Sequence, residues 1–170
     1  MEALIFSALK LAKLNAGAIV FEMSKGDLSD LCKKSVSKVK PILEKKEIKI
    51  ISDYEKNVSW EFDNIWLSEA ISNLIKNSAD HSECTEIKIS LSETAVSAVI
   101  SIQDNGVGIP QSSIPGLFKR FGKISRESGM NSVGIGMSIS EKIIRNHNGE
   151  ILVYSDEGKG TVFEVVLLKQ

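Results

Sequence analysis

A carboxylate followed by two closely spaced glycines is the feature that most constrains how this chain can fold. Asp104 ends a strand-like run over 96–103, and Gly106 and Gly108 follow it directly. Glycines in such positions let the backbone approach a ligand closely or adopt a positive φ. A tight turn between two strands uses the same residue types. The motif therefore predicts either such a turn or a binding loop with one acceptor carboxylate.

Length and composition limit the class of protein. The chain has 170 residues, 42% of them hydrophobic and 25% charged, which is typical of one soluble globular domain. Its net charge of −1 does not favour nucleic acid or an anionic membrane as a partner. Cys32 and Cys84 have no metal-ligand spacing and fit a reducing compartment. Because the chain opens without a basic leader and no apolar run reaches the ~18 residues of a membrane span, we expect a cytoplasmic domain.

Hydrophobic periodicity predicts the elements of the first third of the chain. It indicates a helix over 3–14 and a short strand over 18–21. Asp27 is a suitable N-cap for the next helix, in which Pro41 is expected to cause a kink or an interruption. The same reasoning predicts strands over 48–52 and 59–62.

Residues 64–82 predict a helix with one apolar and one polar face. The polar face carries Asn73 and Asn77 one turn apart, although asparagine is a poor helix former. An amide oxygen is a suitable ligand for Mg²⁺, which takes few protein ligands and fills its octahedron with phosphates and water. A solvated polar face is the alternative interpretation. The predicted core-facing residues are Leu67, Ala70, Ile71, Leu74, Ile75 and Ser78.

The second half of the chain combines strands with two glycine-containing segments. Residues 111–132 are polar and are interrupted by an apolar group at 117–121, which predicts either a linker or a lid that folds over a ligand. Gly134 and Gly136 open a predicted helix whose first N–H groups could bind phosphate. A plain glycine-rich helix start is the alternative, since the Walker sequence is absent. The remaining predicted strands lie at 86–92, 95–103, 150–155 and 161–168.

Taken in order, these motifs resemble the N, G1, F, G2 and G3 boxes of bacterial sensor histidine kinases. The resemblance covers residues 23–169 and implies a Bergerat-type ATP-binding fold. In this fold, an α/β two-layer sandwich, helices pack on one face of a mixed β-sheet, here with a short N-terminal helix. The matching motifs are Asn73-x-x-x-Asn77, Asp104-x-Gly106-x-Gly108, Phe118-x-x-Phe121, Gly134-x-Gly136 and Gly158-x-Gly160-Thr161.

The resemblance also implies roles for single residues, with ATP and Mg²⁺ as cofactors. Asp104 would bind the adenine amino group, with Thr161 near the adenine through water. Asn77 would hold Mg²⁺ across the phosphates, with Asn73 beside it. The amides of Gly134 and Gly136 would contact the phosphates, and the basic residues for the γ-phosphate would be Arg120 and Lys123. The other residues expected around the nucleotide are Asp80, His81, Gly106, Gly108, Ile109, Phe118, Ile135 and Met137.

The chain departs from the family pattern in two places. Many members have Lys or Arg three residues after the magnesium-binding asparagine and an aromatic residue next, where this chain has Asp80 and His81. An ionised acid cannot donate a hydrogen bond to phosphate, so His81 or the lid must supply any donor. The second departure is the phosphoacceptor. Neither His81 nor His147 is followed by the acid and proline of the family's acceptor helix.

These departures predict a catalytic fragment of a longer kinase. Residues 1–22 resemble the end of a dimerisation helix and its connector, and residues 23–170 resemble the catalytic domain. The resemblance implies transfer of the γ-phosphate to a histidine on a dimerisation domain absent from this chain, and then to a response regulator. We expect the fragment to be monomeric and the full-length protein to be a homodimer, with a membrane anchor left open.

Two alternatives from other classes stay open. Anti-sigma serine kinases and gyrase-type or chaperone-type ATPases carry a glutamate four residues before the magnesium-binding asparagine, where it can activate a hydroxyl or water. Asn73 occupies that position here and is neutral, which favours a histidine kinase. The other alternative is a nucleotide-responsive binding module without transfer activity, which Asp80 would favour.

Overall fold

The computed structural model describes residues 2–54, 57–119 and 135–169. Its main sheet has five strands in the order β2-β4-β5-β7-β6, and β1 and β3 form a separate antiparallel pair. Only the β2–β4 pair of the main sheet is parallel, so the sheet is mixed. The strands are β1 Ser24–Asp27, β2 Lys49–Asp53, β3 Ser59–Phe62, β4 Glu86–Glu93, β5 Ser97–Asp104, β6 Gly149–Asp156 and β7 Gly160–Leu168.

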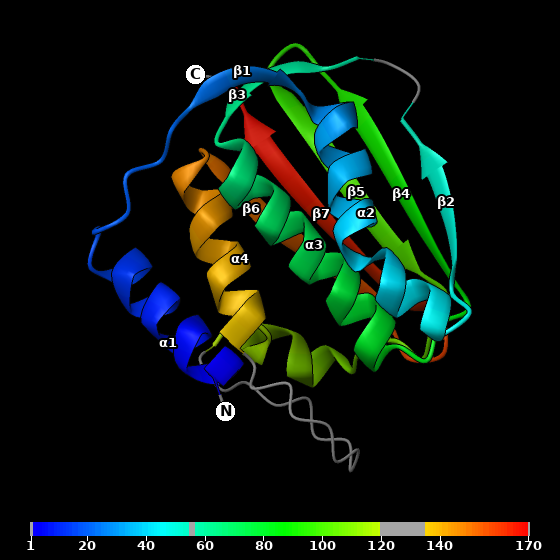
Figure 1. Ribbon diagram of the computed structural model, residues 1–170. Helices are drawn as coiled ribbons and strands as arrows, with labels where there is room; N and C mark the ends of the chain where they lie inside the picture. Colours follow the sequence, from blue (N-terminus) through cyan, green and yellow to red (C-terminus); the bar gives the residue numbers. More distant parts are fainter. Residues whose placement is uncertain (1, 55–56, 120–134, 170) are drawn as a thin grey trace.

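Helices cover one face of this sheet (Figure 1). The helix α3 lies between α2 and α4 and packs against both, while α1 packs against α4. This arrangement confirms the predicted two-layer fold with helices on one face of a mixed sheet. The helices are α1 Glu2–Asn15, α2 Leu28–Lys45, α3 Asn64–His81 and α4 Ile135–Asn146, with a short 3₁₀ helix, η1, at Gln111–Gly116.

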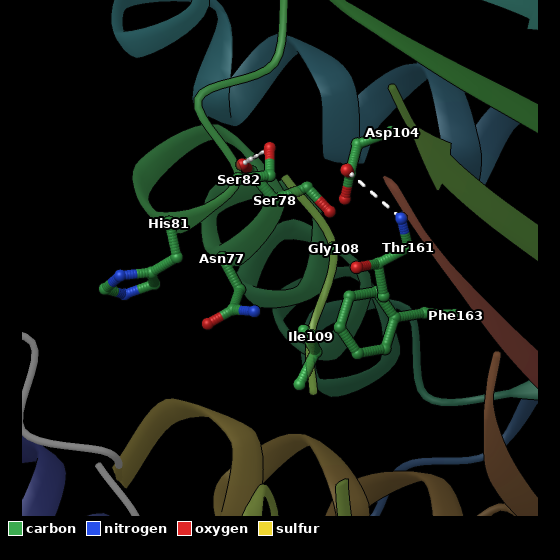
Figure 2. A pocket seen from close by; sticks show the side chains of 9 residues that line it. All are labelled: Asn77, Ser78, His81, Ser82, Asp104, Gly108, Ile109, Thr161 and Phe163. Carbon is green, nitrogen blue, oxygen red and sulfur yellow. Dashed lines mark hydrogen bonds between the residues drawn. The ribbon is translucent and has the colours of Figure 1, made fainter. Parts of the chain in front are cut away.

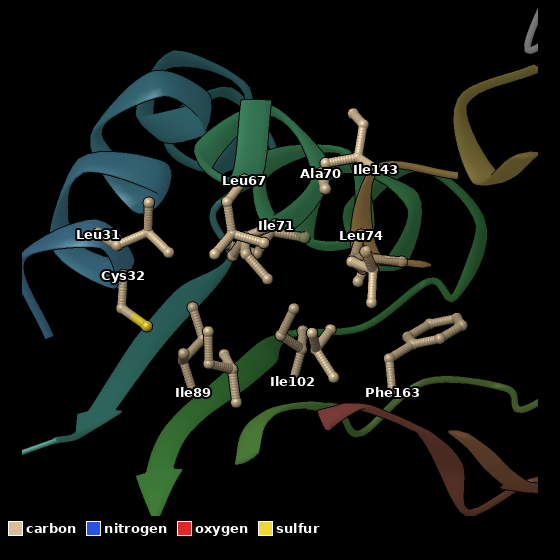
Figure 3. Close-up of a cluster of buried hydrophobic side chains, with 14 of the residues drawn as sticks. Leu31, Cys32, Leu67, Ala70, Ile71, Leu74, Ile89, Ile102, Ile143 and Phe163 are labelled. Carbon is tan, nitrogen blue, oxygen red and sulfur yellow. The ribbon is translucent and has the colours of Figure 1, made fainter. Parts of the chain in front are cut away.

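The buried side of α3 forms the centre of the core. Its predicted core-facing residues are all buried. Several of them, such as Leu67, Ile71 and Leu74, lie over apolar side chains of the sheet that include Ile89, Ile102 and Phe163 (Figure 3). Burial of each large apolar side chain contributes about 1.5–3 kcal/mol. Because α3 is fixed to the sheet along its length, the residues at its C-terminal end are held in a defined position.

The start of α2 confirms the predicted N-cap. The Asp27 carboxylate accepts a hydrogen bond from the Ser29 N–H at 2.8 Å. Of the kink or interruption predicted at Pro41, the interruption is wrong, because the helix continues to Lys45. Pro41 and Ser37 are both exposed, so water can satisfy the carbonyl that loses its N–H partner. Burial of Leu43 in the last turn holds the helix against the core.

The strand predicted over 18–21 is also wrong, because this segment forms no strand. Its alternating apolar residues, Ile19 and Phe21, instead pack against the core. The Phe21 ring meets Trp66 and His147 edge-on, with ring centroids 5.8 and 5.3 Å apart. The spacing that is typical of a strand therefore comes from a connecting segment that lies on the N-terminal end of α3.

Two further observations bear on the predicted class of protein. Cys32 and Cys84 are both buried free thiols, and burial raises the pKa of Cys32 to about 12. Such a thiol stays protonated at neutral pH and acts as a small apolar side chain. Within the described ranges, no helix is both long and apolar enough to span a membrane.

Candidate functional site

A pocket opens where the C-terminal end of α3 meets the ends of β5 and β7 (Figure 2). It combines a carboxylate, an amide, an imidazole and three hydroxyl groups with two apolar side chains. The residues that line it are Asn77, Ser78, His81, Ser82, Asp104, Gly108, Ile109, Thr161 and Phe163. The structure therefore brings together six of the residues predicted around the nucleotide: Asn77, His81, Asp104, Gly108, Ile109 and Thr161.

Asp104 is the buried acidic group of the pocket and is 2% exposed. Its Oδ1 accepts hydrogen bonds from the N–H groups of Gly106 at 3.0 Å and Thr161 at 3.2 Å. Its Oδ2 is buried without a hydrogen-bond partner. Burial raises the pKa of this carboxyl, while the N–H groups of Gly106 and Thr161 and the nearby hydroxyls of Ser78 and Ser82 lower it. An unpaired buried acceptor costs about 1–3 kcal/mol, so Oδ2 is suited to a donor group of a ligand.

Two glycines hold the loop after β5 in contact with its neighbours. A Cβ on Gly106 would lie 2.0 Å from the Ser82 carbonyl oxygen, next to the end of α3. A Cβ on Gly160 would lie 2.0 Å from the Asp104 carbonyl oxygen, and Gly160 has a φ of +87°. Side chains at these positions would separate α3, β5 and β7. The segment after Asp104 is not a tight turn between two strands, because η1 follows it and the next strand among the described residues begins at Gly149.

Asn77 and His81 project from the same end of α3 beside the pocket (Figure 2). Asn77 supplies an amide oxygen, a ligand type that Mg²⁺ accepts. Among the described residues, no group of three or more His, Cys, Asp or Glu side chains could hold a metal ion. A metal at Asn77 would therefore depend on ligands from a bound molecule and water. Burial lowers the pKa of His81, and the nearby Asp80 carboxylate raises it.

Asp80 and Asn73 lie on the same helix but do not line the pocket. The Asp80 carboxylate forms an ion pair with Lys46 on the α2 side, with Oδ1 and Nζ 2.8 Å apart. Asn73 is half-buried one turn before Asn77. Their predicted contacts with a nucleotide stay predictions.

The phosphate side of the predicted site is only partly described. Ile135 and Met137 are buried in the first turn of α4, and Gly136 between them is exposed. The side chain of Phe118 packs partly buried against the core. Three residues predicted to contact phosphate, Arg120, Lys123 and Gly134, lie outside the described residues.

Sequence reasoning missed three serines of the site, Ser155, Ser78 and Ser82, and also Phe163 in the pocket lining. The Ser155 Oγ accepts the Ile109 N–H at 2.7 Å and lies 2.9 Å from the Thr161 Oγ1. It therefore joins the loop after β5 to the start of β7. The Ser78 Oγ is buried at the pocket without a hydrogen-bond partner, although the sequence indicated only a core position. Its place directly after Asn77 was the available signal, whereas nothing in the sequence marks Ser155.

The chain matches known proteins in sequence and in fold. The model for the histidine kinase-, DNA gyrase B- and HSP90-like ATPase family matches residues 62–170. The adaptive-response sensory kinase SasA of Crocosphaera subtropica is 31% identical over 170 residues, which cover 98% of this chain and 44% of SasA. Full-length ShkA, solved in complex with AMPPNP, has a TM-score of 0.86 at 20% identity, covering 97% of this chain and 35% of ShkA.

A nucleotide-free catalytic domain of the histidine kinase ThkA has a TM-score of 0.73 at 23% identity, covering 88% of this chain and 99% of that domain. The structural likenesses show the fold, and the chain spans less than half the length of the curated relatives. Because the family model covers more than half of the residues, the chain belongs to the histidine kinase-, DNA gyrase B- and HSP90-like ATPase family, and the relatives that it matches are sensor kinases.

Proposed function

We propose that this chain is the ATP- and Mg²⁺-binding catalytic domain of a sensor histidine kinase. It transfers the γ-phosphate of ATP to a histidine on a dimerisation domain, from which the phosphate passes to a response regulator. The observation that carries this proposal is the unpaired, buried Oδ2 of Asp104, which lines the same pocket as the amide of Asn77.

The adenine end of the nucleotide lies at Asp104. The free Oδ2 accepts a hydrogen bond from the 6-amino group, and Thr161, which lines the same pocket, contacts the adenine through a water. Ile109 and Phe163 line the same pocket and provide apolar surface for the purine ring. A base with an amino group suits an ionised carboxylate, whereas a 6-oxo base would present a second acceptor to it.

The phosphates lie toward Asn77 and the first turn of α4. When bound, Mg²⁺ neutralises phosphate charge and orients the γ-phosphate for transfer. Asn77 holds it from the protein side, with Asn73 one turn earlier. The exposed Gly136 offers a backbone N–H at the start of α4, where phosphate binding is favourable. Gly134, Arg120 and Lys123 complete this part of the proposed site.

The proposed acceptor histidine comes from another domain. His147 is 4% exposed, and its Nε2 accepts the Asp63 N–H at 3.0 Å. Its Nδ1 lies 2.7 Å from the Ile143 carbonyl oxygen. Both nitrogens are thus engaged, so this imidazole cannot act as a nucleophile. Asn73 cannot act as a base because its amide is neutral. A serine or water needs such a base, whereas a histidine attacks phosphorus without prior deprotonation. The acceptor is therefore better explained as a histidine.

The same proposal places residues 1–22 at the end of the dimerisation helix and in its connector. In α1, Leu11 and Leu14 are buried, and Lys10 pairs with Glu69 of α3 at 2.6 Å. The connector is held by Phe21 and by the Glu22 N–H, which donates to the Asp63 carboxylate at 2.8 Å. Within the proposal the full-length kinase is a homodimer, and this domain works in the cytoplasm.

Two measurements test the proposal together. Calorimetry with an ATP analogue should show binding that is stronger with Mg²⁺ than with a chelator. A time course with ATP and a supplied dimerisation domain should then give phosphohistidine on that domain. Release of free phosphate alone would indicate an ATPase. Binding with neither product would indicate a nucleotide-responsive module, and either result would overturn the proposed transfer.

A further inference from the structure

Asp80 is the residue of α3 that the proposed function leaves unexplained, because an acid next to a phosphate site is unfavourable. We propose that Lys46 is a positioning residue for nucleotide binding, which neutralises Asp80 and holds its carboxylate on the α2 side, away from the phosphates. This inference rests on the proposed function, since it concerns the same pocket and a ligand that carries a polyphosphate.

Lys46 makes two contacts with the last turn of α3. Its Nζ lies 2.8 Å from the Asp80 Oδ1 and donates to the Ala79 carbonyl oxygen at 2.7 Å. That carbonyl is one of the groups at a helix end that lack an N–H partner within the helix. The two side chains are 31% and 24% exposed, so the pair is partly shielded from water. Lys46 is itself fixed as the C-cap of α2.

The pair lies next to residues that line the pocket. Asp80 immediately precedes His81 and follows Asn77 by three residues, and side chains at this spacing are neighbours on a helix. The imidazole responds to both charges. Burial lowers the pKa of the His81 imidazole. The Asp80 carboxylate raises this pKa, and the charges of Lys46 and Lys76 lower it. The charges of Asp80 and Lys46 therefore reach the pocket and oppose each other there.

Without Lys46, the Asp80 carboxylate would act on the pocket as an uncompensated negative charge. Its repulsion would grow with the charge of the ligand, because Coulomb energy is proportional to the product of the two charges. A triphosphate would be affected more than a diphosphate, and an uncharged nucleoside would not be affected. A purely structural role at Ala79 would weaken all three ligands alike.

The test compares Lys46→Met with the unchanged chain by calorimetry, using AMPPNP, ADP and adenosine. Methionine keeps the aliphatic part of the side chain and removes the charge. We expect AMPPNP to bind about 3- to 10-fold more weakly at low salt, ADP to lose less, and adenosine to be unchanged. The double variant Lys46→Met/Asp80→Asn should recover AMPPNP binding. Lys45→Met, an exposed neighbour in the same turn, is the matched control and should have no effect.

A second readout does not depend on a ligand. The pKa of His81, followed by NMR titration, should rise in Lys46→Met and return toward its original value in the double variant. Equal weakening of the three ligands, failure of Asp80→Asn to restore binding, or an unchanged His81 pKa would overturn the inference while the proposed function stands. Absence of AMPPNP binding to the unchanged chain would overturn both.

Discussion

At the scale of single residues, the Asp104 carboxyl combines a structural role with the binding role that we propose for it. Its Oδ1 accepts hydrogen bonds from two backbone N–H groups of the protein, and its Oδ2 is buried without a hydrogen-bond partner. We predict that Asp104→Asn weakens binding of ATP analogues about 10- to 100-fold, the loss expected for a charged hydrogen bond of about 1.5–3 kcal/mol. Isothermal calorimetry measures this loss, and an unchanged affinity would contradict the adenine assignment.

The same substitution should stabilise the unliganded protein at neutral pH. Burial raises the pKa of Asp104 above the value it has in the unfolded chain. The folded state therefore binds more protons in the window between the two pKa values, and unfolding free energy falls as pH rises through it. Asparagine carries no charge and removes this dependence. Thermal unfolding at pH 7 should show a higher Tm for Asp104→Asn, and a lower Tm would argue against an unfavourable buried charge.

Asn77 permits a matched test of the metal ligand. We expect Asn77→Ala to abolish the enhancement of nucleotide binding by Mg²⁺ and to stop transfer to a supplied dimerisation domain, because the only proposed protein ligand is removed. Asn73→Ala, one turn earlier, is the comparison variant and should keep most of the magnesium enhancement. If Asn77→Ala transfers phosphate at the original rate, this face of α3 has only a structural role.

At the scale of helices and strands, the sequence was sufficient to predict the local structure wherever a single residue determines it. Asp27 is the clearest case, since its carboxylate accepts hydrogen bonds from the N–H groups of Ser29 at 2.8 Å and Val58 at 3.2 Å. We predict that Asp27→Ala lowers the free energy of unfolding by about 0.5–2 kcal/mol. Urea denaturation measures the change, and Asp27→Asn should lose less because it can still cap α2.

The pH dependence of this cap has the opposite sign to that of Asp104. Burial alone would raise the pKa of Asp27, but hydrogen bonds from Ser29 outweigh it and lower the pKa. Its stabilising effect is thus present above the unfolded-state pKa and is lost as pH falls through the folded-state pKa. The difference in stability between the unchanged chain and Asp27→Ala should therefore shrink below pH 4, which is close to the ordinary pKa of aspartate.

Contacts between distant parts of the chain explain what the sequence could not predict. The two faces of α3 follow from a period of 3.6 residues, so they were predictable. The alternation at Ile19 and Phe21 imitates a strand, and only tertiary packing distinguishes the two. The contact of Lys46 with Asp80 joins two helices, and that of Asp104 with Thr161 joins two strands. No local pattern specifies either pair.

At the scale of the whole molecule, the family and the fold were predictable because the motifs occur in a fixed order along the chain. The order places Asn77, Asp104 and Thr161 on three different elements, and the antiparallel pairing of β5 with β7 brings the last two together. The course of the connector was not predictable. It depends on Asp63, which caps α3 through the N–H groups of Ile65 and Trp66 and also accepts the Glu22 N–H.

The isolated chain should bind ATP and yet leave itself unlabelled. In-line transfer needs a nucleophile placed opposite the leaving oxygen of the γ-phosphate. The ring nitrogens of His147 are engaged with Asp63 and Ile143 in the interior. His81 lines the pocket together with Asn77, and we expect it to contact the phosphates without lying in line with the γ-phosphate. Incubation with γ-labelled ATP should therefore give no acid-labile label until a dimerisation domain is added. Near-stoichiometric label on His81 or His147 would show that the phosphoacceptor lies within this chain.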